Sequence, residues 1–198
     1  MTAGSGSAPP DDASLIEQSR HEPEAFAGLY DRHAAPIHRY VARRLGDQAA
    51  DDLVAETFLA AFRQRSRYDL ARPDARPWLY GIAANLIGKH RRSEVRMLRA
   101  LARTGVDPVV ESHTERSDAK VSAGAVSRAL AEALGGLSAG DREVLLLVAW
   151  ADLTYEQAAE ALGIPIGTVR SRLSRARRKV REALGGCDPT IPQEEFSR

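Results

Sequence analysis

The chain has 198 residues, and its 28 Lys and Arg nearly balance its 27 Asp and Glu, which leaves a formal net charge of +1. Its 43% hydrophobic and 28% charged residues are typical of a globular protein and exclude a disordered chain. No apolar run of about 18 residues or more occurs, so we expect no transmembrane helix and no direct membrane insertion. The single cysteine, Cys187, excludes an internal disulfide and a thiolate zinc site, and a cytoplasmic location is expected.

Five segments follow one another along the chain. Residues 1–12 are rich in Gly, Ser and Pro and lack the basic and apolar parts of a secretory signal, so a disordered tail is predicted. Residues 13–103 have helical apolar spacing throughout. Residues 104–124 are polar and acidic and are predicted to be a flexible linker. Helical spacing returns over 125–185, and 186–198 form a polar tail. The sequence therefore predicts an all-α protein of two small helical domains joined by a flexible linker.

Three helices are predicted in the first of these domains. The first, interrupted by Pro36, has a buried stripe made of Phe26, Leu29, Tyr30, Ile37, Tyr40 and Val41. The second follows Gly46 and buries Val54, Phe58, Ala61 and Phe62. The third has Pro77 in its first turn. It buries Trp78, Leu79, Ile82, Ala83 and Leu86, and then runs on into a basic segment from Lys89 to Arg96.

The second domain contains a short helix, a tight turn and a longer helix. Ser138 is predicted to cap one helix, and Thr154 with Gln157 forms the capping-box pattern that starts the next, short helix. Gly163 is expected to end the short helix, and the longer one begins near Ile166. This order of elements is typical of a helix-turn-helix.

The last helix separates an apolar stripe from a cationic surface. With about 100° per residue, the apolar side chains gather on one side: Val169, Leu173, Ala176, Val180 and Leu184. Seven basic residues occupy the remaining surface: Arg170, Arg172, Arg175, Arg177, Arg178, Lys179 and Arg181. A solvated helix usually mixes charges of both signs, whereas like charges repel unless phosphates lie opposite. The pattern therefore favours DNA binding over a merely solvated face.

Residues 137–184, LSAGDREVLLLVAWADLTYEQAAEALGIPIGTVRSRLSRARRKVREAL, resemble region 4 of sigma-70-family factors of the extracytoplasmic-function (ECF) group. The segments FAGLYDRHAAPIHRYVARRL, DDLVAETFLAAFRQ and RPWLYGIAANLIGKHRRSEVR resemble region 2 of the same family. The resemblance implies a sigma factor that directs core RNA polymerase to promoters. It implies as partners the β′ clamp helices and other surfaces of core polymerase, promoter DNA, and an anti-sigma factor. It implies no cofactor and no catalysis by the chain itself.

By this resemblance and by helix-turn-helix geometry, the start of the last helix enters the major groove at the −35 element, where arginine can bind guanine edges. The residues expected at or near the bases are Arg170, Ser171, Arg172 and Arg175. Those expected on phosphates are Arg177, Arg178, Lys179 and Arg181. Hydroxyl donation to phosphate is expected from Thr154 and Thr168, with a purely capping role as the alternative for Thr154.

In region 2, the resemblance assigns three acidic residues to the β′ clamp helices: Asp51, Asp52 and Glu56. Asp52 and Glu56 are one helical turn apart and are neighbours on the helix surface. Alternatively, these carboxylates only favour a helix N-terminus through its dipole. Ala55 stands where family members often have Gln.

Residues 67–92 resemble the segment that recognises and opens the −10 element. The residues expected to contact DNA are Asn85, Lys89, Arg91 and Arg92, and the loop 67–76 is a candidate receiver for an extruded base. Lys89 stands where family members frequently have an acidic residue. Trp78 is predicted to be core, whereas Tyr68 and Tyr80 are left open between core and stacking roles.

Two other classes of function are alternatives to a sigma factor. A helix-turn-helix regulator that acts without core polymerase is an alternative, because residues 142–173 also resemble the output domain of response regulators. The first domain lacks the strand–helix alternation of a receiver domain. For an enzyme, no Walker-type phosphate loop or G-x-S-x-G elbow occurs. A metal site of Asp31 and His33 with the region 2 carboxylates lacks ligand spacing, so no catalytic or metal-binding residue is predicted.

Overall fold

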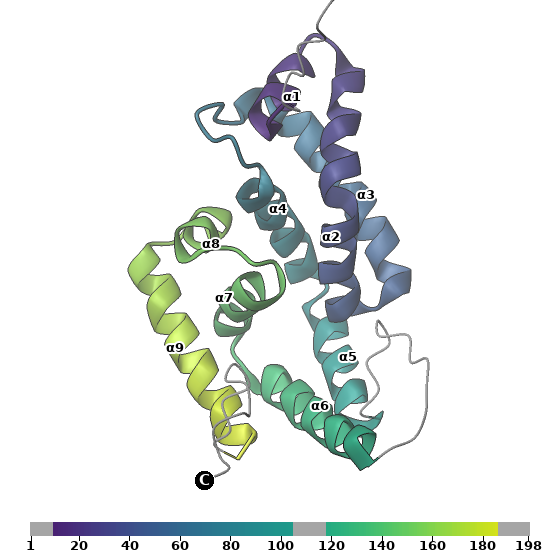
Figure 1. Ribbon diagram of the computed structural model, residues 1–198, viewed down its shortest axis with the longest axis vertical. Coiled ribbons are helices and arrows are strands. Elements are labelled where there is room, and N and C mark those ends of the chain that lie inside the picture. The colour runs from purple at the N-terminus through teal and green to yellow at the C-terminus, as the bar shows by residue number, and fades with distance from the viewer. Residues whose placement is uncertain (1–9, 105–117, 186–198) are drawn as a thin grey trace, which may run out of the picture.

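The computed structural model describes residues 10–104 and 118–185, where all regular structure is helical (Figure 1). The helices are α1 (Asp12–Gln18), α2 (Ala27–Leu45), α3 (Asp47–Gln64), α4 (Arg76–Lys89), α5 (Arg91–Thr104), α6 (Asp118–Gly136), α7 (Ala139–Trp150), α8 (Tyr155–Leu162) and α9 (Ile166–Ala183). Two short 3₁₀ helices, η1 (Pro23–Phe26) and η2 (Arg65–Arg67), flank α2 and α3. The predicted all-α fold is confirmed. In the part of the chain that is described, no helix has the length and apolar character needed to span a membrane.

In the N-terminal half, residues 10–104, α2 and α3 lie side by side and α4 packs against both. Gly46 joins α2 to α3 with a φ of +88°, a conformation that favours glycine. Most of the predicted stripe of α2 is buried, but Tyr30 is 47% exposed and packs edge-on against Phe58. The prediction was wrong for Tyr30 because it follows Leu29 by one residue and so points about 100° away from the buried stripe.

Two predicted boundaries of this half are wrong. Residues 10–12 were assigned to a disordered tail, but Asp11 caps α1 by accepting a hydrogen bond from the Ser14 backbone N–H at 2.8 Å, and Asp12 is buried. The helix with Pro77 in its first turn, α4, does not run on into the basic segment. It ends at Lys89, where the His90 N–H donates to the Ile87 carbonyl at 2.8 Å and tightens the last turn before α5 begins.

The predicted linker is shorter than residues 104–124. Thr104 belongs to α5, and α6 begins at Asp118, so residues 118–124 are helical. These residues begin α6, whose 19 residues include six alanines, the residue with the highest helix propensity. Residues 1–9, 105–117 and 186–198, which include Cys187, lie outside the described part of the chain.

The C-terminal half, residues 118–185, contains the predicted helix-turn-helix. Ser138 caps α7 by accepting a hydrogen bond from the Asp141 N–H. Thr154 and Gln157 form the full capping box of α8, and Gly163 ends that helix in the left-handed conformation with a φ of +62°. The buried residues of α9 are Val169, Leu173, Ala176 and Val180, which confirms the predicted stripe as far as Val180, while Leu184 is half-buried at the residue that ends the helix.

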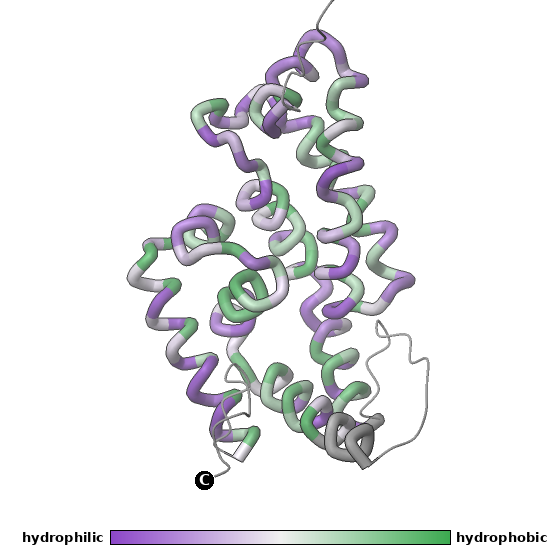
Figure 2. Tube along the Cα trace, viewed as in Figure 1, coloured by the Kyte–Doolittle hydropathy of each residue, from purple (hydrophilic) through white to green (hydrophobic). Residues whose placement is uncertain are grey.

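The two halves pack against each other, a contact that sequence analysis did not predict. Helix α8 lies against α4, α5 lies against α6, and the buried side chains of both halves form one continuous core. Figure 2 shows hydrophobic residues concentrated along α4 and α7, where the halves meet, and hydrophilic residues recurring along α9.

Candidate nucleic-acid and polymerase interfaces

Helix α9 presents the predicted −35 residues on its outer surface, because its apolar stripe packs on α7 and α8. The exposed members are Arg170, Ser171, Arg175, Arg177, Arg178, Lys179 and Arg181, while Thr168 and Arg172 are half-buried. The Ser171 hydroxyl donates to the Thr168 carbonyl at 3.0 Å, and Arg177 donates to the Tyr155 hydroxyl at 3.3 Å. The predicted residues therefore form one continuous cationic surface.

Two of the predicted base-facing arginines are oriented by α7. Arg175 Nη2 donates to Asp141 Oδ1 at 3.0 Å. Burial would raise the pKa of the Asp141 carboxyl, but hydrogen bonds from Arg175 and Ser138 outweigh this and lower it. Arg172 lies over Gly140, where an added Cβ would be 3.0 Å from its Nη1. Sequence analysis missed Asp141 as a positioning residue, because its place in the first turn of α7 indicated only a helix-start role.

Thr154 supports α8 and is also exposed. Its hydroxyl accepts from the Gln157 N–H at 3.2 Å, and Gln157 Oε1 accepts from the Thr154 N–H at 2.9 Å. The hydroxyl hydrogen is not used by this capping box. The capping role is therefore confirmed, and phosphate donation stays a prediction that this geometry allows.

A basic groove of about 1030 Å³ lies at the junction of α4 and α5. Its lining residues are Lys89, His90, Arg91, Arg92, Ser93, Val95, Arg96 and Arg99. Three of the four predicted −10 residues meet there, while Asn85 is exposed one turn earlier on α4. Arg96 and Arg99 were missed, although their spacing of four and seven residues from Arg92 places all three on one helix face.

The predicted clamp-binding acids form an exposed face on α3. Asp51, Asp52 and Glu56 are all exposed, and His38 Nε2 lies 3.1 Å from Asp51 Oδ1. Leu59 is 48% exposed one turn after Glu56. An exposed leucine beside acidic residues gives this face the mixed apolar and charged character of a docking surface.

The three aromatic residues near the −10 segment are packed in this structure. Tyr68 is buried against Trp78, with ring centroids 4.9 Å apart, and its hydroxyl donates to the Arg72 carbonyl at 2.7 Å. Tyr80 is buried against Tyr40, with ring centroids 5.2 Å apart. Burial raises the pKa of both Tyr68 and Tyr80. In this conformation, Tyr68 and Tyr80 are core residues.

The chain matches two family models, "Sigma-70 region 2" over residues 29–97 and "Sigma-70, region 4" over residues 127–180. It is 38% identical over 165 residues to the ECF RNA polymerase sigma factor SigL of Mycobacterium tuberculosis, which covers 82% of this chain and 90% of that protein. It is 32% identical over 165 residues to the RNA polymerase sigma factor CarQ of Myxococcus xanthus, with the same coverage of 82% and 90%.

Solved structures of sigma factors share this fold. The structure of CnrH in complex with the cytosolic domain of CnrY matches with a TM-score of 0.59 and 30% identity, over 88% of this chain and 97% of that one. The sigma factor RpoE of Bartonella quintana, solved with the anti-sigma factor NepR, matches in fold with a TM-score of 0.57 and 24% identity, over 82% of this chain and 98% of that one. The chain therefore belongs to the sigma-70 family of transcription initiation factors, in its ECF group.

Proposed function

We propose that this sigma factor binds core polymerase through the acidic face of α3 and recognises promoters through two basic surfaces, the groove at α4 and α5 and the outer surface of α9. The observation that carries this proposal is the sorting of charge. The seven basic residues of α9 lie outside its buried stripe, and no acidic residue interrupts them between Arg170 and Arg181. The exposed carboxylates of Asp51, Asp52 and Glu56 lie instead on α3.

The acidic face of α3 docks on the β′ clamp helices of core RNA polymerase. The carboxylates of Asp52 and Glu56 provide negative charge that complements a positive surface on the partner. Leu59 provides exposed apolar surface that becomes buried on docking. Holding both DNA-binding halves on one large partner raises their effective concentration at the promoter. Neither half then needs high affinity for DNA alone.

The two basic surfaces bind the two promoter elements. Arg170, Ser171, Arg172 and Arg175 read bases at the −35 element, while Arg177, Arg178 and Lys179 bind phosphates, with Thr154 and Thr168 as hydroxyl donors. Asn85, Lys89, Arg91 and Arg92 bind the −10 element. Arginine in the major groove binds guanine edges through two hydrogen bonds, whereas phosphate contacts position the protein without reading sequence.

The protein acts in the cytoplasm, where polymerase acts, and has no enzymatic activity of its own. We include a cognate anti-sigma factor as a partner, because the similar CnrH is solved in complex with the cytosolic domain of CnrY. The match to region 2 over residues 29–97 favours a sigma factor over a regulator that binds DNA without polymerase.

Run-off transcription with core RNA polymerase on a library of promoter templates tests the proposed function. The chain is expected to give discrete transcripts from a subset of templates that core polymerase alone does not use. A regulator independent of polymerase would instead bind duplex DNA and fail to co-purify with core polymerase. Initiation that is the same with and without the chain, on every template, would contradict the proposal.

Asp52→Lys tests the docking face. Reversing this charge places a cation where a carboxylate meets core polymerase, so affinity for core polymerase is expected to fall while α9 binds duplex DNA unchanged. Glu17→Lys, a charge reversal at an exposed position on α1, serves as the matched control. Equal polymerase affinity of the two variants, measured by fluorescence anisotropy, would refute the assignment of α3.

A further inference from the structure

The loop between η2 and α4, residues 67–76, is the candidate receiver for an extruded base and is here called the −10 loop. The residues at its tip are exposed: Asp69, Ala71, Arg72 and Pro73. Surface loops are more mobile than the elements they connect, and a mobile loop loses conformational freedom when it closes on a ligand. A loop that is already held in its binding form avoids part of this cost. The contacts that hold the −10 loop therefore bear on how well it can bind a base.

The first end of the −10 loop is held by the turn that follows α1. Arg20 Nη2 donates to the backbone carbonyls of Ser66 and Tyr68, both at 3.3 Å. In the opposite direction, Arg65 Nε donates to the Ser19 carbonyl at 3.1 Å. A single guanidinium thus binds two carbonyls at the point where the chain leaves η2 and enters the loop.

The second end of the −10 loop is held by the first residue of α1. The Asp12 N–H donates to the Pro73 carbonyl at 3.2 Å, and Asp12 Oδ2 accepts from the Ala75 N–H at 2.9 Å. Helix α1 is itself fixed to the core, because Ile16 is fully buried. Residues 12–20 therefore connect the two ends of the loop through one short helix, and these contacts are here called the α1 brace.

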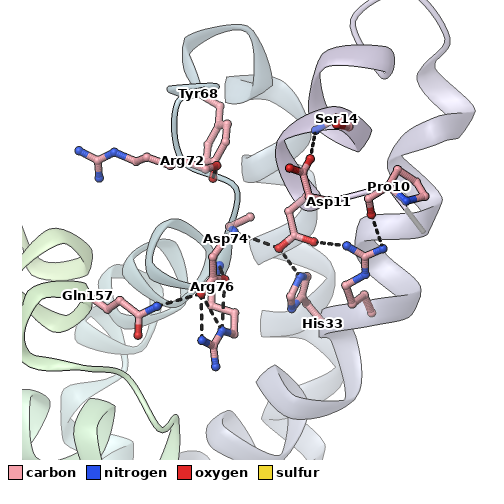
Figure 3. Close-up of polar contacts among 12 residues, drawn as sticks. Pro10, Asp11, Ser14, His33, Tyr68, Arg72, Asp74, Arg76 and Gln157 are labelled. Atoms are coloured by element: carbon pink, nitrogen blue, oxygen red, sulfur yellow. Dashed lines mark hydrogen bonds and ion pairs between the residues drawn. The ribbon is translucent and has the colours of Figure 1, made fainter. Parts of the chain in front are cut away.

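The tip of the −10 loop has hydrogen bonds of its own. The Asp69 side chain accepts from the Ala71 N–H and from Arg72 Nε, both at 3.1 Å, and the Tyr68 hydroxyl donates to the Arg72 carbonyl at 2.7 Å. Figure 3 shows the loop running from Tyr68 to Asp74 next to the start of α1. Among the described residues, the hydrogen bonds of the α1 brace reach the ends of the loop and leave its tip open to a ligand.

Helix α8 also binds the −10 loop. Gln157 Nε2 donates to Asp74 Oδ2 at 2.8 Å, and Glu160 forms an ion pair with Arg72. These two contacts join the halves, whereas both partners of every bond in the α1 brace belong to the N-terminal half. The brace therefore does not depend on how the two halves pack.

We propose that Arg20 is a positioning residue for −10 recognition: together with Asp12 at the other end, it holds the −10 loop in the form that receives an extruded base. The inference rests on the proposed function, which assigns the −10 element to the N-terminal half. It deepens that function by giving α1, which lies outside both basic surfaces, a part in promoter recognition. Arg20 acts through the loop backbone and does not read the base itself.

The test measures how much each base of the −10 element contributes to holoenzyme binding. The probe is a fluorescein-labelled promoter from the run-off library, with its −10 element held open as a bubble of mismatched bases. Each non-template base is replaced in turn by an abasic site, and the affinity ratios of intact to abasic template form the base profile. Wild type is expected to lose about tenfold at the position whose base enters the loop, which is within the range for stacking of one base.

Arg20→Ala is expected to reduce this loss to about threefold or less and to leave the other ratios of the base profile unchanged. The physical reason is that an unbraced loop must be ordered when the base binds, so the base contributes less net affinity. A merely structural role would lower the affinity for all templates by one common factor and leave every ratio as in wild type. Either that result or an unchanged profile in a folded Arg20→Ala would overturn the inference.

Two further variants keep the test sharp. Arg63→Ala is the matched control, because Arg63 is exposed near the end of α3 and forms no hydrogen bond or ion pair with the described residues. It should keep the wild-type base profile. Arg20→Lys keeps the charge, but its ammonium ends one bond short of the position of Nη2, so it should show the same change to a smaller degree. Circular dichroism checks folding, and Arg20→Lys decides the question if Arg20→Ala does not fold.

Arg92→Ala separates failure of the inference from failure of the proposed function. It removes an expected phosphate contact, so it should weaken binding to intact and abasic templates alike. If it does so while Arg20→Ala keeps the wild-type profile, or while no abasic site weakens wild type, the inference is wrong and the proposed −10 surface stands. If Arg92→Ala binds like wild type and no abasic site matters, the proposed −10 surface itself is wrong.

Discussion

Asp12 connects three parts of the N-terminal half through one buried carboxylate. Its oxygens lie 2.8 Å from His33 Nε2 and 2.5 Å from Arg32 Nη1, and they accept from the Ala75 N–H at 2.9 Å (Figure 3). Burial by itself would raise the pKa of this carboxyl. The hydrogen bonds from His33, Ala75 and Arg32 outweigh burial and lower it from the ordinary 3.8 to about 2. The ionised form therefore stabilises the fold, and it holds the start of α4 through Ala75.

Asp12→Asn is expected to lower the free energy of unfolding at neutral pH by about 2 kcal/mol, the size given by the difference between the folded and ordinary pKa values of the carboxyl. Because the folded pKa is the lower one, the contribution is complete above about pH 4 and is lost as the pH falls toward 2. Urea unfolding from pH 7 downward should show the difference between wild type and variant shrinking below pH 4. Asp11→Asn is the control, since asparagine caps a helix as well as aspartate. Equal stability of the two variants at pH 7 would contradict the role of Asp12.

Arg175→Ala tests base reading at the −35 element. If Arg175 reads a base, the loss should be about 1–3 kcal/mol of binding free energy at promoters with a −35 element, and little at templates without one. Arg178→Ala, at an expected phosphate contact, should lower affinity on all templates alike. Asp141→Asn should reduce the same discrimination by a smaller amount, because it loosens the 3.0 Å pair that orients Arg175. The measurement is holoenzyme binding to matched and altered −35 templates, and a uniform loss for Arg175→Ala would assign it to phosphate instead.

At the scale of single elements, α5 extends the basic groove beyond the residues that sequence analysis assigned to DNA. Arg96→Ala and Arg99→Ala should each weaken holoenzyme binding on every promoter and lower the slope of log affinity against log salt by about 1, because each removes about one phosphate contact. Arg103→Ala, exposed on the same helix but outside the groove lining, should leave the slope unchanged. A slope equal to that of wild type in Arg96→Ala and Arg99→Ala would show that the groove does not hold DNA.

Elements with local signals could be predicted from the sequence. The capping box of α8 and the glycine that ends this helix depend on residues within about one turn of each other. The stripe of α9 from Val169 to Val180 depends on apolar residues that recur every three or four positions. All three predictions are confirmed. Boundaries that depend on distant contacts could not be predicted. Asp12 belongs to the fold because His33 and Ala75 bind it, and neither is near it in sequence.

At the scale of the whole molecule, the contact between the halves joins residues that are far apart along the chain. Gln157 and Asp74 are 83 residues apart, and Glu143 and Arg44 are 99 residues apart. Helical periodicity and capping patterns involve only residues that are close in sequence. They could therefore predict local helix roles for Glu143 and Gln157, but not their distant partners. The candidate site shows the same limit. The cationic surface of α9 could be predicted from the sequence, whereas the packing of the helix-turn-helix beside the predicted −10 loop is visible only in the tertiary structure.

Glu143→Gln tests whether the buried charges couple the two halves. Glutamine keeps the size of the side chain but loses its charge, so the paired hydrogen bonds to Arg44 weaken, while Glu94 still accepts from Arg44 at 2.7 Å. The expected loss is about 1.5–3 kcal/mol, the range for hydrogen bonds to charged groups, and it should weaken the coupling between the halves. Differential scanning calorimetry should then show one transition for wild type and two, or one broader one, for the variant. Glu132→Gln, at an exposed position on α6, is the control. If Glu143→Gln unfolds with the midpoint and width of Glu132→Gln, the pair formed by Glu143 and Arg44 contributes no coupling between the halves.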